Sequence, residues 1–143
     1  MRRTSPTCTL LATLAILCGL SAGQSDNSQP PSLDPALARA PAVAATWINP
    51  YAGQDNAARA GRKLFERHCA ECHGQSGQGS ERAPRLAKAS VHNAPPGVLF
   101  WFVKNGALKE GMPAWSRLPD QRLWQIVTYL QTMTPEESAK TSP

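Results

Sequence analysis

The sequence predicts an all-α domain of three to four helices arranged around one short cysteine and histidine motif. Apolar residues recur at helical spacing in three segments, near residues 56–70, 98–105 and 119–133. Glycine and proline interrupt the chain between these segments, and the alternation of strands and helices that a β-α-β protein needs is missing. With 143 residues, the chain has room for one domain and two extended ends.

The first 23 residues have the order of a secretory signal peptide. Two arginines follow Met1, an apolar run covers residues 10–20, and small residues come next. The run is shorter than the ~20 apolar residues of a membrane span. We therefore expect cleavage after Gly23, a periplasmic or otherwise exported protein, and no membrane span in the mature chain. Lipidation at Cys18 is the alternative, but no small residue stands directly before this cysteine.

Residues 24–46 have the composition of a linker. They are rich in Ser, Pro, Ala and Gln, and four prolines between positions 30 and 41 are too frequent for a helix. This composition predicts a flexible or semi-extended leader. The folded domain is expected to span residues 47–134, starting where large apolar residues return at Trp47, and residues 135–143 to form a disordered tail.

The segment Cys69-Ala70-Glu71-Cys72-His73 has the spacing at which c-type haem is attached. Its two thiols can add across the two vinyl groups of one porphyrin edge, and the next side chain can then bind the iron. Zinc is an alternative, but it generally takes four ligands. A redox-active dithiol is another, although it belongs to β-α-β proteins. Because Cys8 and Cys18 fall in the signal segment, one cysteine pair remains, and it predicts one covalently bound haem c.

The helix expected over residues 56–70 leads into this motif, with Asp55 or Asn56 available as its N-cap. Gly61, Phe65 and Cys69 are four residues apart and therefore share one face. Glycine inside a helix costs about 1 kcal/mol relative to alanine. Its presence predicts that another helix approaches closely at this position.

Two further helices are predicted. Residues 98–105 follow Pro95-Pro96-Gly97 and are apolar nearly all round, which fits a wall of a cofactor pocket and a plain core helix equally well. The last helix, residues 119–133, carries one apolar stripe. The stripe consists of Leu123, Ile126, Val127 and Leu130.

Met112 is the candidate for a second axial ligand of the iron. It lies between a glycine and a proline in a segment too broken for a helix. Its soft thioether suits haem iron, and a His/Met pair raises the reduction potential. Three other side chains compete for this role: Met133 at the end of a helix, His68 beside Cys69, and His92.

Pro84 follows the glycine-rich loop after His73. A proline carbonyl can accept the Nδ1 hydrogen of a metal-bound histidine, and such a bond fixes the orientation of the ring. From the residues alone, an ordinary loop proline remains the alternative.

Residues 51–133 resemble a class I cytochrome c of the small bacterial type. The resemblance rests on the haem motif together with Gly61, Phe65, Pro84, Leu86, Gly111, Met112, Pro113, Trp124 and Tyr129. It implies the cytochrome c fold around one covalent haem. It also implies attachment through Cys69 and Cys72, iron ligation by His73 and Met112, and a hydrogen bond from His73 to Pro84.

The resemblance further implies that the first and last helices cross where Gly61 meets Ile126 and Tyr129. Trp115 is expected in the haem pocket, where it would help to exclude water. One departure from the family is visible at Pro119, where relatives often have a serine or threonine cap.

With both axial positions filled, the expected function is outer-sphere transfer of single electrons, with no catalytic residues. The implied partners are redox proteins such as a quinoprotein dehydrogenase, a terminal oxidase or another cytochrome, either met in solution or joined in a complex. A haem enzyme or gas sensor with a displaceable sixth ligand is the alternative.

The charge of the chain is modest. The formal charge of +5 becomes +3 once the two arginines of the signal segment are removed, and no dense basic patch of a nucleic-acid binder is present. Arg82, Arg85 and Lys88 are candidates for steering an acidic partner. An ordinary solvated loop is the alternative for these three residues.

Overall fold

Helices form the whole frame of the domain in the computed structural model, which describes residues 34–134. Within these residues there are five α-helices, three 3-10 helices and no β-strand, so the all-α prediction is confirmed. The expected signal peptide, the first part of the expected linker and the expected tail lie outside the described residues. The longer helices are α1 (Asp55–His68), α4 (Pro96–Asn105) and α5 (Asp120–Leu130), and the short ones are η1 (Leu37–Arg39), η2 (Ala42–Thr46), α2 (Ala70–His73), α3 (Ala89–His92) and η3 (Leu108–Glu110).

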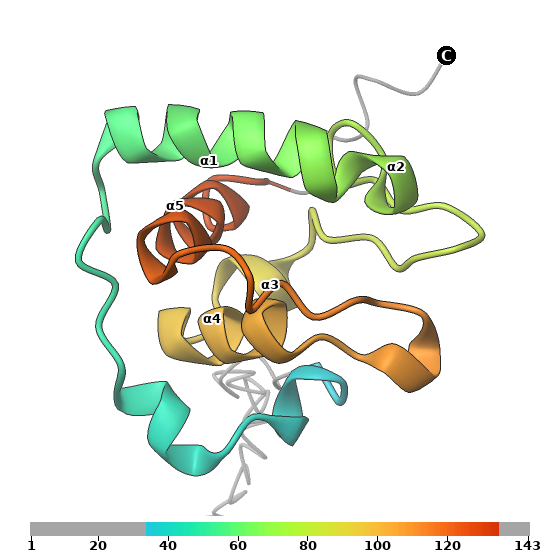
Figure 1. Ribbon diagram of the computed structural model, residues 1–143, viewed down its shortest axis with the longest axis horizontal. Coiled ribbons are helices and arrows are strands. Elements are labelled where there is room, and N and C mark those ends of the chain that lie inside the picture. Colours follow the sequence, from blue (N-terminus) through green and yellow to red (C-terminus); the bar gives the residue numbers. More distant parts are fainter. Residues whose placement is uncertain (1–33, 135–143) are drawn as a thin grey trace, which may run out of the picture.

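The helices α1 and α5 cross in direct contact, and Gly61 makes this crossing possible (Figure 1). A Cβ atom at position 61 would lie 1.9 Å from the backbone oxygen of Gln125 and 3.0 Å from the Cβ of Tyr129. One turn later, the rings of Phe65 and Tyr129 meet edge to face with their centroids 5.4 Å apart. The predicted close approach is present, and the backbone that it meets is that of Gln125, the residue before Ile126.

The apolar stripe of α5 forms the centre of the core. Leu123, Ile126 and Val127 are at most 1 % exposed, and Leu130 is 5 % exposed, as their spacing predicts. On the other side of α5, Trp124 stacks on Phe100 of α4 with a centroid distance of 4.1 Å. Thus α5 is packed between α1 and α4, in the order that Figure 1 shows from top to bottom.

The helix ends differ in detail from the sequence expectation. Helix α1 begins after Gln54, which makes no side-chain cap, so neither Asp55 nor Asn56 is its N-cap. Asp55 instead lies in the first turn, where its charge favours the helix dipole. Helix α4 ends at Asn105, as predicted, and its C-cap is Gly106, whose φ of 68° suits glycine.

Residues 34–46 are folded onto the domain, which corrects the prediction that they are part of a linker. Leu37 and Ala44 are buried, at 6 % and 0 % exposed, and η2 packs against α4. A Cβ at Gly97 would lie 2.0 Å from the backbone oxygen of Ala44, so the two segments touch through their backbones. The prolines limit this segment to two short 3-10 helices, η1 and η2. The residues between the prolines still pack against the domain.

None of the helices within residues 34–134 has the length and apolar character needed to cross a membrane.

Candidate functional site

The two cysteines lie where α1 ends and the short helix α2 begins. The backbone nitrogen of Cys69 donates to Phe65 at 2.8 Å, and the carbonyl of Cys69 accepts from the nitrogen of His73 at 2.9 Å. Both thiols are free and half-buried. The turn of α2 therefore holds two sulfur atoms and one imidazole on the wall of the same cavity.

The side chain of His73 is held by the carbonyl of Pro84. His73 is 8 % exposed, and its Nδ1 lies 2.9 Å from the Pro84 oxygen. A carbonyl can only accept, so Nδ1 carries the hydrogen and Nε2 is the nitrogen available to a metal. The contact expected of Pro84 is therefore present.

The loop that carries Pro84 is fixed by its own backbone bonds. The nitrogen of Leu86 donates to the oxygen of Gly77 at 2.7 Å, and that of Gly79 donates to the oxygen of His73 at 2.8 Å. At Gly79, where φ is 86°, a Cβ would come within 2.7 Å of the nitrogen of Arg85. The glycines of this loop thus let it fold back tightly enough to bring Pro84 under the imidazole.

Met112 lies in a hairpin-like loop between α4 and α5. Its backbone forms an isolated antiparallel bridge with Ala107, through N–H to oxygen distances of 2.9 and 3.1 Å. Gly111, at a φ of 85°, makes the turn that η3 needs before Met112. The next anchor is Trp115, whose nitrogen donates to the oxygen of Val103 at 3.2 Å.

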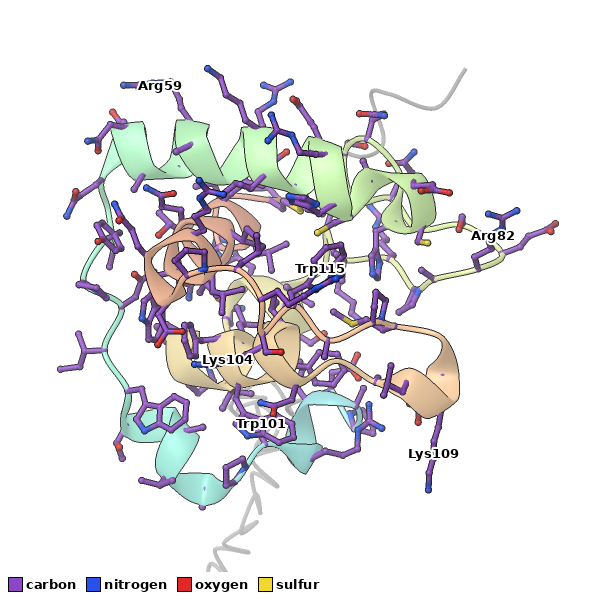
Figure 2. All side chains as sticks on the ribbon, in the orientation of Figure 1. Arg59, Arg82, Trp101, Lys104, Lys109 and Trp115 are labelled. Atoms are coloured by element: carbon purple, nitrogen blue, oxygen red, sulfur yellow. The ribbon has the colours of Figure 1, made fainter. Side chains whose placement is uncertain are left out.

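A cavity of about 530 Å³ brings these segments together. Its volume lies within the usual range of small-molecule sites. Trp115 lies near the middle of the view in Figure 2, between α1 above and α4 below. The wall is mainly apolar, and its members include Phe65, Cys69, Cys72, His73, Pro84, Leu86, Leu99, Phe102, Val103, Met112, Trp115, Ile126 and Leu130.

Helix α4 has both roles that its apolar sequence allowed. Leu99, Phe102 and Val103 face the cavity, whereas Phe100 packs in the core against Trp124 and Trp47. The helix is therefore a wall of the cavity on one side and part of the core on the other.

The structure separates Met112 from two of its three competitors. Met133 is 4 % exposed and belongs to the hydrophobic core, and His92 is exposed on α3; neither is on the cavity wall. His68 does reach the wall, where its ring lies against that of Trp115 at a centroid distance of 4.9 Å.

The surroundings of His68 disfavour its charged form. Partial burial lowers the pKa of His68, and the nearby positive charges of Arg67 and Arg122 lower it further.

These side chains fit a c-type haem. The cavity offers two thiols for attachment, an imidazole whose Nε2 is free for a metal, and a thioether. Burial raises the pKa of the Cys69 thiol to about 12, and the neighbouring Cys72 adds to this rise. Cys69 is thus a neutral thiol at neutral pH, unlike the activated thiolate of a redox-active dithiol.

Two of the three cations expected to attract an acidic partner are engaged in interactions within the domain. Lys88 is paired with Asp34 at 2.5 Å, and Arg85 donates through Nε to the oxygen of Ala87 at 2.9 Å. Arg82 is exposed at the tip of its loop, pointing away from the domain in Figure 2.

The contributions of Asp34, Leu37 and Arg39 to the cavity wall escaped the sequence analysis. One signal pointed to them: Leu37, like Leu33, is a large apolar residue in a stretch of mainly small and polar residues.

Helices around a cavity that contains a Cys-Cys-His motif and a methionine define the class of the c-type cytochromes, which are electron-transfer proteins and not enzymes. Within this class, residues 56–130 match the family described as cytochrome c oxidase, cbb3-type, subunit III. The match covers more than half of the chain, so the chain belongs to this family. A comparison with curated proteins finds no match.

Among solved structures, the fold is similar to that of Cytochrome CL from the marine methylotrophic bacterium Methylophaga aminisulfidivorans. The TM-score is 0.50 and the sequence identity is 25 %. The similarity covers 65 % of this chain and 71 % of that chain. Family and fold together confirm the predicted cytochrome c and imply haem c as its cofactor.

Proposed function

We propose that this protein is an exported cytochrome with one covalent haem, ligated by His73 and Met112, which carries single electrons between redox partners. The observation that carries this proposal is the convergence of Cys69, Cys72, His73 and Met112 on one mainly apolar cavity. When bound, the haem supplies an iron that takes up and releases one electron.

The cysteines attach the cofactor. Each thiol adds across one vinyl group, with its sulfur bonding to one carbon and its hydrogen going to the other, so no oxidant is consumed. Because Cys69 caps α2 and Cys72 lies three residues later within this helix, both cysteines reach the same cavity wall.

The two axial side chains have different tasks. His73 binds through Nε2, while its Nδ1 donates to Pro84 at 2.9 Å and keeps the ring from rotating. Met112 provides a neutral, soft ligand that favours the reduced state. With both positions filled by protein, no site remains open for a substrate, and electrons pass without bond formation.

The apolar wall keeps water away from the metal. Leu99, Val103 and Trp115 line the cavity, and a dry, low-dielectric environment disfavours the more highly charged oxidised state. Burial and axial ligation therefore act on the reduction potential in the same direction.

The partners follow from the family and from the residues around the site. The family description supports a place beside a terminal oxidase, as a free carrier or as a subunit. In the segments Leu99-Phe100-Trp101 and Met112-Pro113-Ala114-Trp115 the chain resembles small bacterial cytochromes that accept electrons from quinoprotein dehydrogenases, and this resemblance supports such a dehydrogenase as donor. Arg82, exposed beside the cavity, is the cation best placed to attract an acidic partner.

The ligation is tested by comparing two methionines. We expect the full chain, produced with a c-type haem maturation system, to carry one haem by mass and to show the absorption band of methionine-ligated ferric haem. Met112→Ala should abolish that band and allow carbon monoxide to bind the reduced protein. Met133→Ala removes a buried methionine outside the cavity and should keep the band. Ready binding of carbon monoxide by the parent protein would instead favour a gas sensor or haem enzyme.

The attachment is tested by replacing both thiols. Cys69→Ala combined with Cys72→Ala should give a haem-free chain with little fixed structure. Without haem, the apolar cavity of this small domain would be empty and its core incomplete. A cooperative, native-like melting transition of this double variant would contradict that expectation. An optical spectrum of the parent without haem bands would overturn the proposed function itself.

A further inference from the structure

Residues 34–47 precede the segment that matches the family, yet they form part of the haem cavity. Leu37 is 6 % exposed and lines the cavity, and Ala44 is completely buried. The ring of Trp47 meets Phe100 edge to face at a centroid distance of 6.0 Å. This N-terminal segment therefore adds a wall to the site beyond the family domain.

Two ion pairs connect the N-terminal segment to different parts of the cavity. Asp34 pairs with Lys88, just before α3, at 2.5 Å. Arg39 pairs with Glu110, at the end of η3, at 2.9 Å. All four side chains lie on the cavity wall, so the segment bridges two of its borders.

The second ion pair acts on the loop that presents Met112. Glu110 precedes Met112 by two residues, and η3 itself is largely solvent-exposed, with Leu108 at 74 %. The bridge between Ala107 and Met112 closes the base of this loop but does not join it to another element. Arg39 joins the loop to another element, because its guanidinium binds Glu110 and also lies 5.3 Å from the ring centroid of Phe102 on α4.

We propose that Arg39 is a positioning residue for Met112, and that the N-terminal segment keeps the Met112 loop closed over the haem. The inference rests on the proposed role of Met112 as axial ligand. Arg39 restrains η3 through Glu110, and Leu37 fills the adjoining part of the cavity. An outside ligand can reach the iron only when the loop opens, so its apparent affinity scales with the open fraction.

The expected size of the effect follows from the exposure of the pair. The Arg39 and Glu110 side chains are 42 % and 57 % exposed, so their ion pair is of the surface type. Such pairs change an equilibrium roughly two- to fivefold. Loss of the pair should therefore raise the affinity of a competing ligand by about this factor.

Imidazole is the probe, because its binding to the ferric protein displaces methionine and removes the methionine absorption band. We expect Arg39→Gln and Glu110→Gln each to raise the imidazole affinity of the haem-loaded full chain about two- to fivefold. The double variant should resemble Arg39→Gln, because that change already removes the ion pair and also the contact of Arg39 with Phe102. Arg39→Glu combined with Glu110→Arg should restore much of the parent affinity.

A matched control lies on α1, where Arg62 and Glu66 form a pair at the same distance of 2.9 Å, with 66 % and 41 % exposed side chains. Arg62→Gln should leave the imidazole affinity unchanged. The inference is overturned if Arg39→Gln behaves like Arg62→Gln, or if the effects of Arg39→Gln and Glu110→Gln simply add. A parent protein without the methionine band would refute the proposed ligation instead, so the two failures are distinguishable.

Discussion

Replacing Gly61 by alanine tests the helix crossing on which the domain is built. The new Cβ would lie 1.9 Å from the backbone oxygen of Gln125, whereas ordinary contacts of a Cβ begin at 3.4 Å. The obstacle is backbone, which cannot rotate away like a side chain, so α1 and α5 would have to move apart. Because Phe65 and Tyr129 pack one turn further along, this movement would loosen their contact as well.

The magnitude follows from two opposing terms. Overpacking of this kind costs up to about 3 kcal/mol, and alanine regains about 1 kcal/mol of helix propensity over glycine. The free energy of unfolding should therefore fall by about 2 kcal/mol. For a domain of this size, such a loss lowers the melting temperature by roughly 8–16 °C.

Thermal unfolding of the haem-loaded protein, followed by far-ultraviolet circular dichroism, measures this effect. Gly53→Ala is the comparison, because Gly53 has a φ of 71° but nothing within 4 Å of the added Cβ. The Gly53→Ala variant reports how much free energy of unfolding is lost when alanine takes a left-handed backbone conformation and no clash occurs. If Gly61→Ala melts at the same temperature as the parent protein, the close crossing of the two helices is refuted.

Three further outcomes are expected. Asn49→Ala should lower the free energy of unfolding by about 1–3 kcal/mol, because Asn49 is 3 % exposed and bonds Thr128 at 2.9 Å; an unchanged denaturant midpoint would contradict this. The bond from Lys88 lowers the pKa of Asp34 below 3.8, so the Asp34 carboxylate stabilises the fold above that pH and loses its contribution as the pH falls through its folded pKa. The stability difference between the parent and Asp34→Asn should thus be constant near neutral pH and vanish in acid, and a difference that persists in acid would oppose the ion pair. Oxidation by ferricyanide, an anion, should slow with rising ionic strength, and Arg82→Gln should weaken this dependence more than Lys88→Gln does, since Lys88 is already paired; insensitivity to salt would exclude steering.

The parts of the molecule that the sequence predicted depend on short stretches of chain. The stripe of α5 repeats within eight residues, and its members Leu123 to Leu130 are buried as their spacing requires. The haem motif lies within five residues, and α2 holds it in one turn. Neighbouring residues determine these features, so composition and periodicity suffice to find them.

The N-terminal segment could not be predicted in this way, because its partners are distant. Asp34 and Lys88 are 54 residues apart, and Arg39 and Glu110 are 71 residues apart. Its prolines indicate only that no long helix forms. The small residue Ala44 is buried because Gly97 has no side chain and lets the two backbones come into contact. Only the assembled fold reveals that such a segment is docked.

The two axial side chains are held by unequal means, and this difference shapes what the site can do. His73 is 8 % exposed, belongs to the helical turn that contains Cys72 and is capped by Cys69, and is bonded to Pro84 through Nδ1. Met112 is half-buried in a loop that is restrained by one backbone bridge, by the ion pair of its neighbour Glu110 and by the bond from the Trp115 nitrogen to the oxygen of Val103. Since opening that loop breaks fewer interactions than unfolding the turn of α2, an entering ligand should displace the methionine and leave the histidine bound. The identity of the iron's sixth ligand, and with it the reduction potential, is therefore controlled from the side of the cavity that the N-terminal segment covers.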